Sequence, residues 1–183
     1  MKKKSIIALV LAMIMVLSLC ACGGAGENYY SIGDTVETES VKMTLKDAQF
    51  TYAVNSTKDA DYLKPTEPSP LTPYVADDGA VMVYYEIDIA AIGRSDIDID
   101  NCDIATITYD GEVYDADMVN YMSHGNSTGY GNLLLSSGQS AENHRGFFQI
   151  LVDAPLDSEF LITFNLPSGQ ETEQFTFKVG GEN

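Results

Sequence analysis

Hydrophobic and polar residues alternate with a period of two along much of the chain, the spacing of a β-strand that buries one face. The longest example is residues 79–92, where the apolar positions run from Val81 to Ala91 on one face. Met82, Tyr84, Glu86 and Asp88 occupy the other face. The pattern predicts a strand in a sheet with one buried face.

A change of parity marks a second strand. The apolar positions of residues 41–54 are odd-numbered up to Leu45 and even-numbered from Ala48 to Val54, with Tyr52 among them. Because side chains of a regular strand alternate strictly, a change of parity within one strand predicts a β-bulge near Lys46.

Turn signals separate further β-capable segments. Asp110-Gly111 lies between two such segments and predicts a tight hairpin, while Ser136–Gln139 and Pro167–Gly169 read as turns. Other predicted strands lie at 96–109, 112–114, 133–135, 140–152, 159–166 and 175–179.

Two polar segments predict long loops. Residues 55–78 contain four prolines, which a central strand does not accept, and residues 115–132 are rich in Gly, Asn and Ser. Loops of this length in a compact domain often carry function. Seven or more short strands separated by turns predict an all-β fold, an antiparallel β-sandwich.

The N-terminus has the pattern of an export signal. Lys2–Lys4 precede an apolar run over residues 5–19, which as a helix would span about 22 Å, less than a bilayer core of about 30 Å. Leu19-Cys20-Ala21-Cys22 resembles the bacterial lipobox. The resemblance implies cleavage before Cys22 and a diacylglyceryl group on its sulfur, which anchors the chain stably at a membrane. An ordinary secretory signal cut near Ala21 is the alternative.

These features divide the chain into residues 1–21, a lipoprotein signal peptide; residues 22–32, the lipidated Cys22 with a flexible tether; and residues 33–180, the sandwich domain. Removal of residues 1–21 takes away three of the ten basic residues and none of the 27 acidic ones, leaving a net charge of −20. Such a charge disfavours nucleic acid and anionic lipid as partners. We therefore expect the lipid, and not electrostatic attraction, to hold the protein at the outer face of the cell membrane.

Lipidation of Cys22 would leave Cys102 without a disulfide partner within the mature chain. We therefore expect the domain to fold without a disulfide and Cys102 to be a small buried apolar residue. A reactive thiol or an intermolecular bridge is the alternative.

The order of these segments resembles a known family. Gly33–Val36 opens the domain, Tyr109–Tyr114 reads YDGEVY, and residues 133–155 read LLLSSGQSAENHRGFFQILVDAP. Over about residues 32–180 the chain is similar to the telokin-like, immunoprotective-extracellular-protein family of bacterial lipoproteins. The resemblance implies an immunoglobulin-like β-sandwich. It transfers no catalytic residue.

An acidic cluster is the first candidate site. Asp96, Asp98, Asp100 and Asp103 resemble the start of a calcium loop, but Asn101 and Ile107 stand where an EF-hand needs Gly and an acid. Residues i and i+2 of a strand lie about 6.6 Å apart, too far for neighbouring carboxylates to share an ion unless the segment curls. A solvated acidic strand with Ile97 and Ile99 inward is the main interpretation; weak calcium or small-molecule binding is the alternative.

Catalytic motifs are not apparent. His124 and His144 are the only histidines, and neither belongs to a nucleophile-elbow or HExxH pattern. We expect both to lie at the surface or in hydrogen bonds, the protein not to be an enzyme, and no cofactor to be required.

Tyrosines in the predicted loops are the second candidate site, because Tyr gives a large contact area at low entropic cost. We therefore expect a binding or interaction domain whose partner is a protein or envelope component, contacted through the loops at 55–78 and 115–132. The sequence leaves the partner and the oligomeric state open. The tyrosines proposed for contact are Tyr62, Tyr74, Tyr121 and Tyr130.

Overall fold

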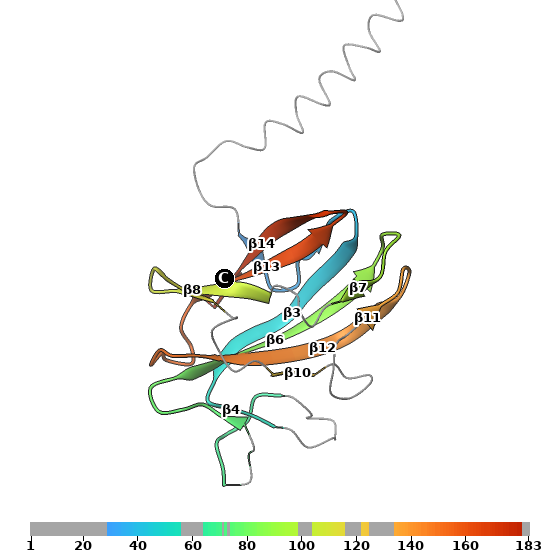
Figure 1. Ribbon diagram of the computed structural model, residues 1–183. Coiled ribbons are helices and arrows are strands. Elements are labelled where there is room, and N and C mark those ends of the chain that lie inside the picture. Colours follow the sequence, from blue (N-terminus) through green and yellow to red (C-terminus); the bar gives the residue numbers. More distant parts are fainter. Residues whose placement is uncertain are drawn as a thin grey trace, which may run out of the picture.

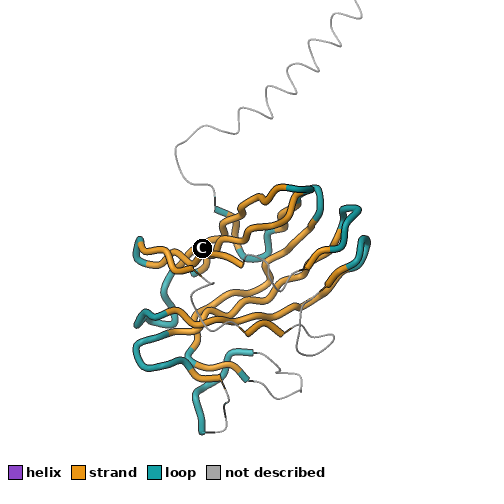
Figure 2. The backbone as a smooth tube through the Cα atoms, viewed as in Figure 1, coloured by secondary structure: helices purple, strands orange, loops and turns teal. Residues whose placement is uncertain are grey.

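A computed structural model describes residues 29–55, 64–70, 72, 74–98, 104–115, 122–124 and 134–180. These residues form strands, turns and connecting segments, and no helix occurs among them (Figure 2). The strands are β1 (Tyr30–Ser31), β2 (Thr35–Glu37), β3 (Val41–Thr51), β4 (Ala53–Val54), β5 (Tyr74–Val75), β6 (Val81–Ala91), β7 (Ile97–Asp98), β8 (Ile104–Tyr109), β9 (Glu112–Asp115), β10 (Met122–His124), β11 (Leu134–Leu135), β12 (Ser140–Ile150), β13 (Phe160–Ser168) and β14 (Glu171–Val179).

Two sheets pack face to face (Figure 1). The first sheet has the order β10-β12-β6-β3-β2 and the second sheet has the order β1-β14-β13-β8-β9. Apart from β1, β2 and β9, which extend the edges of the two sheets, the strands can be lettered A to G along the chain: β3, β6, β8, β10, β12, β13 and β14. The sheets are then ABED and CFG. This is the immunoglobulin order. The fold class expected from the sequence is therefore confirmed: an all-β, immunoglobulin-like antiparallel sandwich.

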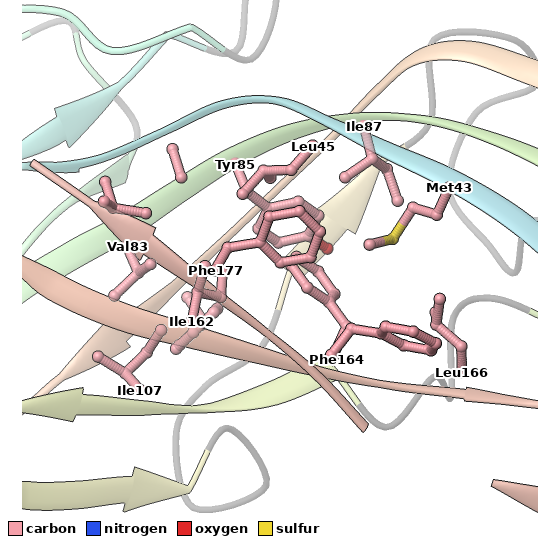
Figure 3. Close-up of a cluster of buried hydrophobic side chains, with 14 of the residues drawn as sticks. Met43, Leu45, Val83, Tyr85, Ile87, Ile107, Ile162, Phe164, Leu166 and Phe177 are labelled. Atoms are coloured by element: carbon pink, nitrogen blue, oxygen red, sulfur yellow. The ribbon is translucent and has the colours of Figure 1, made fainter. Parts of the chain in front are cut away.

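The core between the sheets is built from the alternating apolar positions of the long strands (Figure 3). Tyr85 of β6 meets Phe164 of β13 edge to face at a centroid distance of 6.0 Å, and Phe50 of β3 stacks on Phe160 at 4.2 Å. In antibody domains a disulfide joins these two central strands, B and F. Here aromatic contacts link the sheets, each worth about 0.5–1.5 kcal/mol beyond area burial.

Local chemistry fixes the register of the strands. The pairing of β3 with β6 shifts between Leu45 and Asp47, which confirms the bulge predicted from the change of parity. The β8–β9 hairpin turns at Asp110 and Gly111, whose φ angles are 49° and 79°. Two positive φ angles define a type I′ turn, so the hairpin prediction is also confirmed.

Close packing explains one glycine of β12. Gly146 lies opposite Tyr85 in the neighbouring strand, and the Tyr85 ring lies across it. An added Cβ at Gly146 would clash with the Tyr85 hydroxyl oxygen, so no larger residue fits while the ring keeps this position.

A small sheet covers the outer face of the first sheet. We call it the flap: residues 53–55, 64–66 and 74–76, joined by the β4–β5 pair, a Val54–Pro65 bridge and the bond from Asn55 N to Lys64 O. Figure 1 shows it on the opposite side of the first sheet from β13 and β14. Met82 and Tyr84 of β6 are buried on this side. The prediction that β6 buries one face therefore holds only for its second half, where Glu86, Asp88 and Ala90 are partly exposed. In the first half it was wrong, because Met82 packs with Val54 of the flap where solvent was expected.

Short strands occur where polar sequence predicted other structure. Tyr30–Ser31, assigned to the tether, pairs in parallel with β14, and the Tyr30 ring lies 5.4 Å from Phe177. Met122–His124, assigned to a loop, pairs with β12. Pro167, expected in a turn, belongs to β13, and the turn falls at Gly169-Gln170 instead.

Candidate functional site

The flap is attached to the first sheet by an apolar cluster and by polar bonds. Val54, Met82 and Phe147 form the cluster, and the Tyr74 ring lies 5.0 Å from that of Phe147. Asp77 N donates to Gln149 Oε1 at 2.8 Å, and Gln149 Nε2 donates to Asp77 Oδ2 at 2.7 Å. These contacts fix the end of the flap against β12.

A polar network lies on the same face of the first sheet. Arg145 Nε donates to Glu86 Oε2 at 2.6 Å, and the Tyr84 hydroxyl donates to the same oxygen at 3.2 Å. The ion pair is largely withdrawn from water, with the Arg145 and Glu86 side chains 11% and 14% exposed. Such a pair specifies geometry more than it adds stability, because desolvation offsets its attraction.

The phenol of Tyr84 is held in its protonated form. Burial raises the pKa of Tyr84, and the neighbouring Glu86 carboxylate raises it further, while Arg145 opposes the shift. A phenol with a raised pKa keeps its proton at neutral pH and does not serve as a base. We therefore interpret this network as a support for the surrounding surface.

An open pocket of about 350 Å³ lies at the end of β3, beside the flap. Its described lining includes the β3 end, the proline-containing segment after Lys64, and Leu156 from the β12–β13 connection. Tyr52 is 36% exposed and Leu156 43% exposed, so both present apolar surface to solvent at the pocket. The described lining residues are Gln49, Phe50, Thr51, Tyr52, Pro65, Thr66, Glu67, Pro68 and Leu156.

The lining of this pocket combines apolar surface with a few polar groups. The polar groups are an amide, two Thr hydroxyls, the Tyr52 hydroxyl and the Glu67 carboxylate, and the walls are aromatic, aliphatic and proline surface. None of the described lining residues is His, Cys, Lys or Arg. The arrangement offers van der Waals contact, a few hydrogen bonds and one negative charge, which suits recognition of an extended chain.

The predicted acidic cluster is only partly within the described residues. Asp96 is exposed, and the backbone of Asp98 lies in β7, which pairs with β11. Asp100 and Asp103 lie outside the described residues. Ile97 is buried, as the solvated-strand interpretation expects. No group of three metal-ligating side chains occurs in the described part of the chain, so cation binding at this cluster stays a prediction.

Of the four predicted contact tyrosines, only Tyr74 lies within the described residues. Tyr74 belongs to β5 rather than to a loop, and its ring packs against Phe147. Tyr62, Tyr121 and Tyr130 lie outside the described residues, so their binding role stays a prediction. The tyrosine that lines the pocket is Tyr52.

The histidines differ from each other. His124 contributes backbone to β10, paired with Arg145. His144 is 1% exposed, which corrects any placement of it at the surface. Burial lowers the pKa of His144 to about 4, so it is neutral at physiological pH.

The pocket is lined by three segments that the sequence alone did not indicate to be neighbours: residues 49–52, residues 65–68 and Leu156. Tyr52 was expected to face the core with Ala48 and Phe50, but the chain bends at Tyr52 and exposes its ring. Leu156 carried no signal beyond its place in a turn. The prolines near residue 65 marked the segment that contributes Pro65 and Pro68 to the pocket, although not the other lining residues.

The anchoring residue Cys22 and the unpaired-cysteine candidate Cys102 both lie outside the described residues. Within the part of the chain that the structure describes, no helix has the length and apolar character needed to cross a bilayer.

Comparison with other proteins shows similarity at the level of fold. No protein family model matches the chain, and no curated protein matches its sequence. A Bacillus subtilis protein described as a candidate lipoprotein is similar in structure, with 12% identity and a TM-score of 0.48; the match covers 81% of this chain and 39% of that one. A β-sandwich protein from Clostridium difficile is similar with 14% identity and a TM-score of 0.45, over 85% and 97% of the two chains.

Proposed function

We propose that this protein is an exported lipoprotein, held at the outer face of a bacterial membrane through Cys22, whose immunoglobulin-like domain binds a protein or envelope component without catalysing a reaction. The lipobox pattern Leu19–Cys22 supports the location. We also propose a relationship to the telokin-like lipoprotein family, supported by the order of its sequence features.

The observation that carries the binding function is the pocket between the end of β3, the 65–68 segment and Leu156. Apolar surface that is exposed next to a concave site commonly marks a contact surface. The Tyr52 ring is well suited to such contact, because Tyr buries a large area while losing little rotamer freedom.

The rigid surroundings of the pocket favour recognition. Tyr52 O accepts a bond from Ala76 N at 2.8 Å, so one wall is tied to the flap. The flap in turn is tied to β12 through Asp77 and Gln149. A preformed site reduces the ordering that binding requires.

Site-directed photo-crosslinking tests this function. A photo-reactive amino acid at position 52 of the full chain, expressed in its own envelope, should crosslink to a discrete partner. The matched control is position 134, because Leu134 is also apolar and is 59% exposed, but lies in the β7–β11 pair away from the pocket.

Equal crosslinking from positions 52 and 134, or none from position 52, would contradict the pocket as the contact site. Crosslinks at position 52 that are competed by excess unmodified protein would support it.

A further inference from the structure

We propose that the edge of β3 beside the pocket accepts an extended, positively charged peptide segment as an added β-strand. The inference rests on the proposed binding function and specifies the chemistry of the partner and how it is held.

The edge of β3 is only partly occupied. One side of β3 pairs with β6 along its whole length, whereas β2 pairs with the other side only at Lys42, Met43 and Thr44. The bond from Gly33 N to Leu45 O at 2.7 Å extends this cover by one residue. From residue 46 to residue 51, no described strand pairs with this edge.

The bulge determines which backbone groups point to the unpaired edge. Leu45 O points away from β6, since it accepts from Gly33. The register then shifts, and Ala48 and Phe50 lie opposite Tyr85 and Val83. Backbone groups in an antiparallel pair point alternately toward and away from the partner. Ala48 and Phe50 therefore direct their N–H and C=O groups outward.

These outward groups are suited to backbone hydrogen bonding with an added strand at two residues, Ala48 and Phe50. The side chains of Ala48 and Phe50 face the core, so only their backbone remains for an incoming segment. No described residue donates to or accepts from these outward groups. An unpaired backbone group at a sheet edge needs water or a new strand as its partner.

The pocket continues this edge and supplies side-chain contacts. Its β3 wall runs from Gln49 to Tyr52, and Pro65 and Pro68 lie among the residues that complete it. Because proline has no backbone N–H, these positions cannot donate to a competing ladder. The incoming segment would pair with β3 and place alternate side chains against proline, Tyr52 and Leu156.

The charge of the region favours a basic segment. Glu67 lines the pocket, Asp47 accepts a bond from Gln49 of the lining at 3.2 Å, and Asp157 follows Leu156 in sequence. Lys46 is paired with Asp88 at 3.3 Å, so Lys64, next to Pro65, is the nearby cation that forms no ion pair within the described residues. The whole chain carries a net charge of −17, so basic peptides are steered toward it.

Three labelled hexapeptides test the proposal by fluorescence anisotropy with the full chain in detergent at physiological salt. The first alternates Lys and Val, the second alternates Glu and Val, and the third is the Lys/Val peptide with N-methyl groups on its central amides. We expect the Glu/Val peptide to bind at least about tenfold more weakly, and N-methylation to weaken binding by about fivefold or more, since it removes the ladder without changing charge.

A matched pair of charge reversals separates the site from general attraction. Glu67→Lys and Glu171→Lys change the net charge equally, but Glu171 begins β14 in a turn beside Ser40, at the opposite end of β3. We expect Glu67→Lys to weaken Lys/Val binding by about fivefold or more and Glu171→Lys to have little effect. Equal losses in both variants would overturn the assignment to this site.

Residue-resolved amide exchange tests the strand itself. Ala48 and Phe50 amides should exchange slowly only when the Lys/Val peptide is bound, whereas Gln49 and Thr51 amides, which face β6, should be protected in both states. If Glu67→Lys abolishes binding while Ala48 and Phe50 exchange is unchanged, the pocket binds its ligand but strand addition is wrong. If no peptide binds and position 52 still crosslinks to a partner, the proposed function stands and this inference fails.

Discussion

His144 shows how a single residue in the core couples the fold to pH. It lies on β12 with the parity of Gly146 and Phe148, which face the second sheet. Its burial lowers its pKa from 6.5 to about 4. Because the protonated form is disfavoured only in the folded state, the unfolded chain binds the proton more readily between these two values.

We expect the free energy of unfolding to fall as pH drops through this window. The folded pKa lies below the unfolded one, so the contribution of neutral His144 is complete above pH 6.5 and is lost toward pH 4. The loss should be about 2 kcal/mol between pH 8 and pH 5. Urea denaturation of the full chain at a series of pH values measures it.

Two histidine variants isolate the effect. His144→Gln should flatten the slope of stability against pH between pH 5 and pH 8, whatever its effect on absolute stability. His124→Gln removes the other histidine of the chain and should leave the slope intact. The same slope in wild type and His144→Gln would show that another group is responsible.

The sequence contained the signal for this placement. His144 shares even parity with Phe148 and Ile150, and strict alternation places all three on one face. The polarity of His suggested solvent instead. The bulge between Ala141 and His144, with Asn143 at a φ of 53°, interrupts the alternation of buried and exposed positions just before His144. This interruption made the buried position of His144 hard to recognise from the sequence.

At the scale of elements, long strands and tight turns could be predicted and short partners could not. β6 and the bulge in β3 follow from periodicity because many alternating residues carry each signal. Asp110-Gly111 defines its hairpin through two residues that tolerate positive φ. By contrast, β1 and β10 are two and three residues long, and pairing with remote strands creates them.

The candidate site was predictable only in outline. Four prolines marked residues 55–78 as unusual, and the pocket does border this segment. Its other walls come from the end of β3 and from Leu156, which is 88 residues after Pro68 in sequence. Such convergence depends on tertiary packing, which no local pattern encodes.

The flap gives an element-scale prediction. Phe147 anchors it on the outer face of the first sheet, so Phe147→Ala should open the flap locally as well as destabilise the domain by about 3–5 kcal/mol. Limited proteolysis should then cut near the flap before the sandwich strands. Phe175→Ala is the matched control, since Phe175 lies in the main core.

A cleavage pattern near residues 53–76 that is the same in Phe147→Ala, Phe175→Ala and wild type would show that the flap does not depend on Phe147. Selective cleavage in Phe147→Ala would establish the flap as a separately stabilised unit, as expected for a small cluster beside a larger core.

At the scale of the whole molecule, charge and anchoring have to be considered together. A chain cleaved before Cys22 would carry a net charge of −20 and be repelled by anionic headgroups, so the proposed residence at a membrane requires an anchor that outweighs this repulsion. The two acyl chains proposed on Cys22 would supply it, because each buried CH₂ contributes about 0.8 kcal/mol. The fold itself is stabilised by the apolar core between the sheets, to which the aromatic contacts contribute.

Replacement of the anchoring residue tests this account. Cys22→Ala removes the sulfur that would carry the lipid, so we expect the protein to lose labelled fatty acid. The variant should then either appear in the soluble fraction or accumulate as the uncleaved precursor. Cys20→Ala is the matched control, since it removes the neighbouring cysteine of the same segment and should keep both label and membrane association. Processed Cys22→Ala protein that still sediments with membranes would mean that contacts of the domain, and not the lipid, hold it there. Loss of label in Cys20→Ala instead would place the lipid on the other cysteine and move the start of the mature chain by two residues.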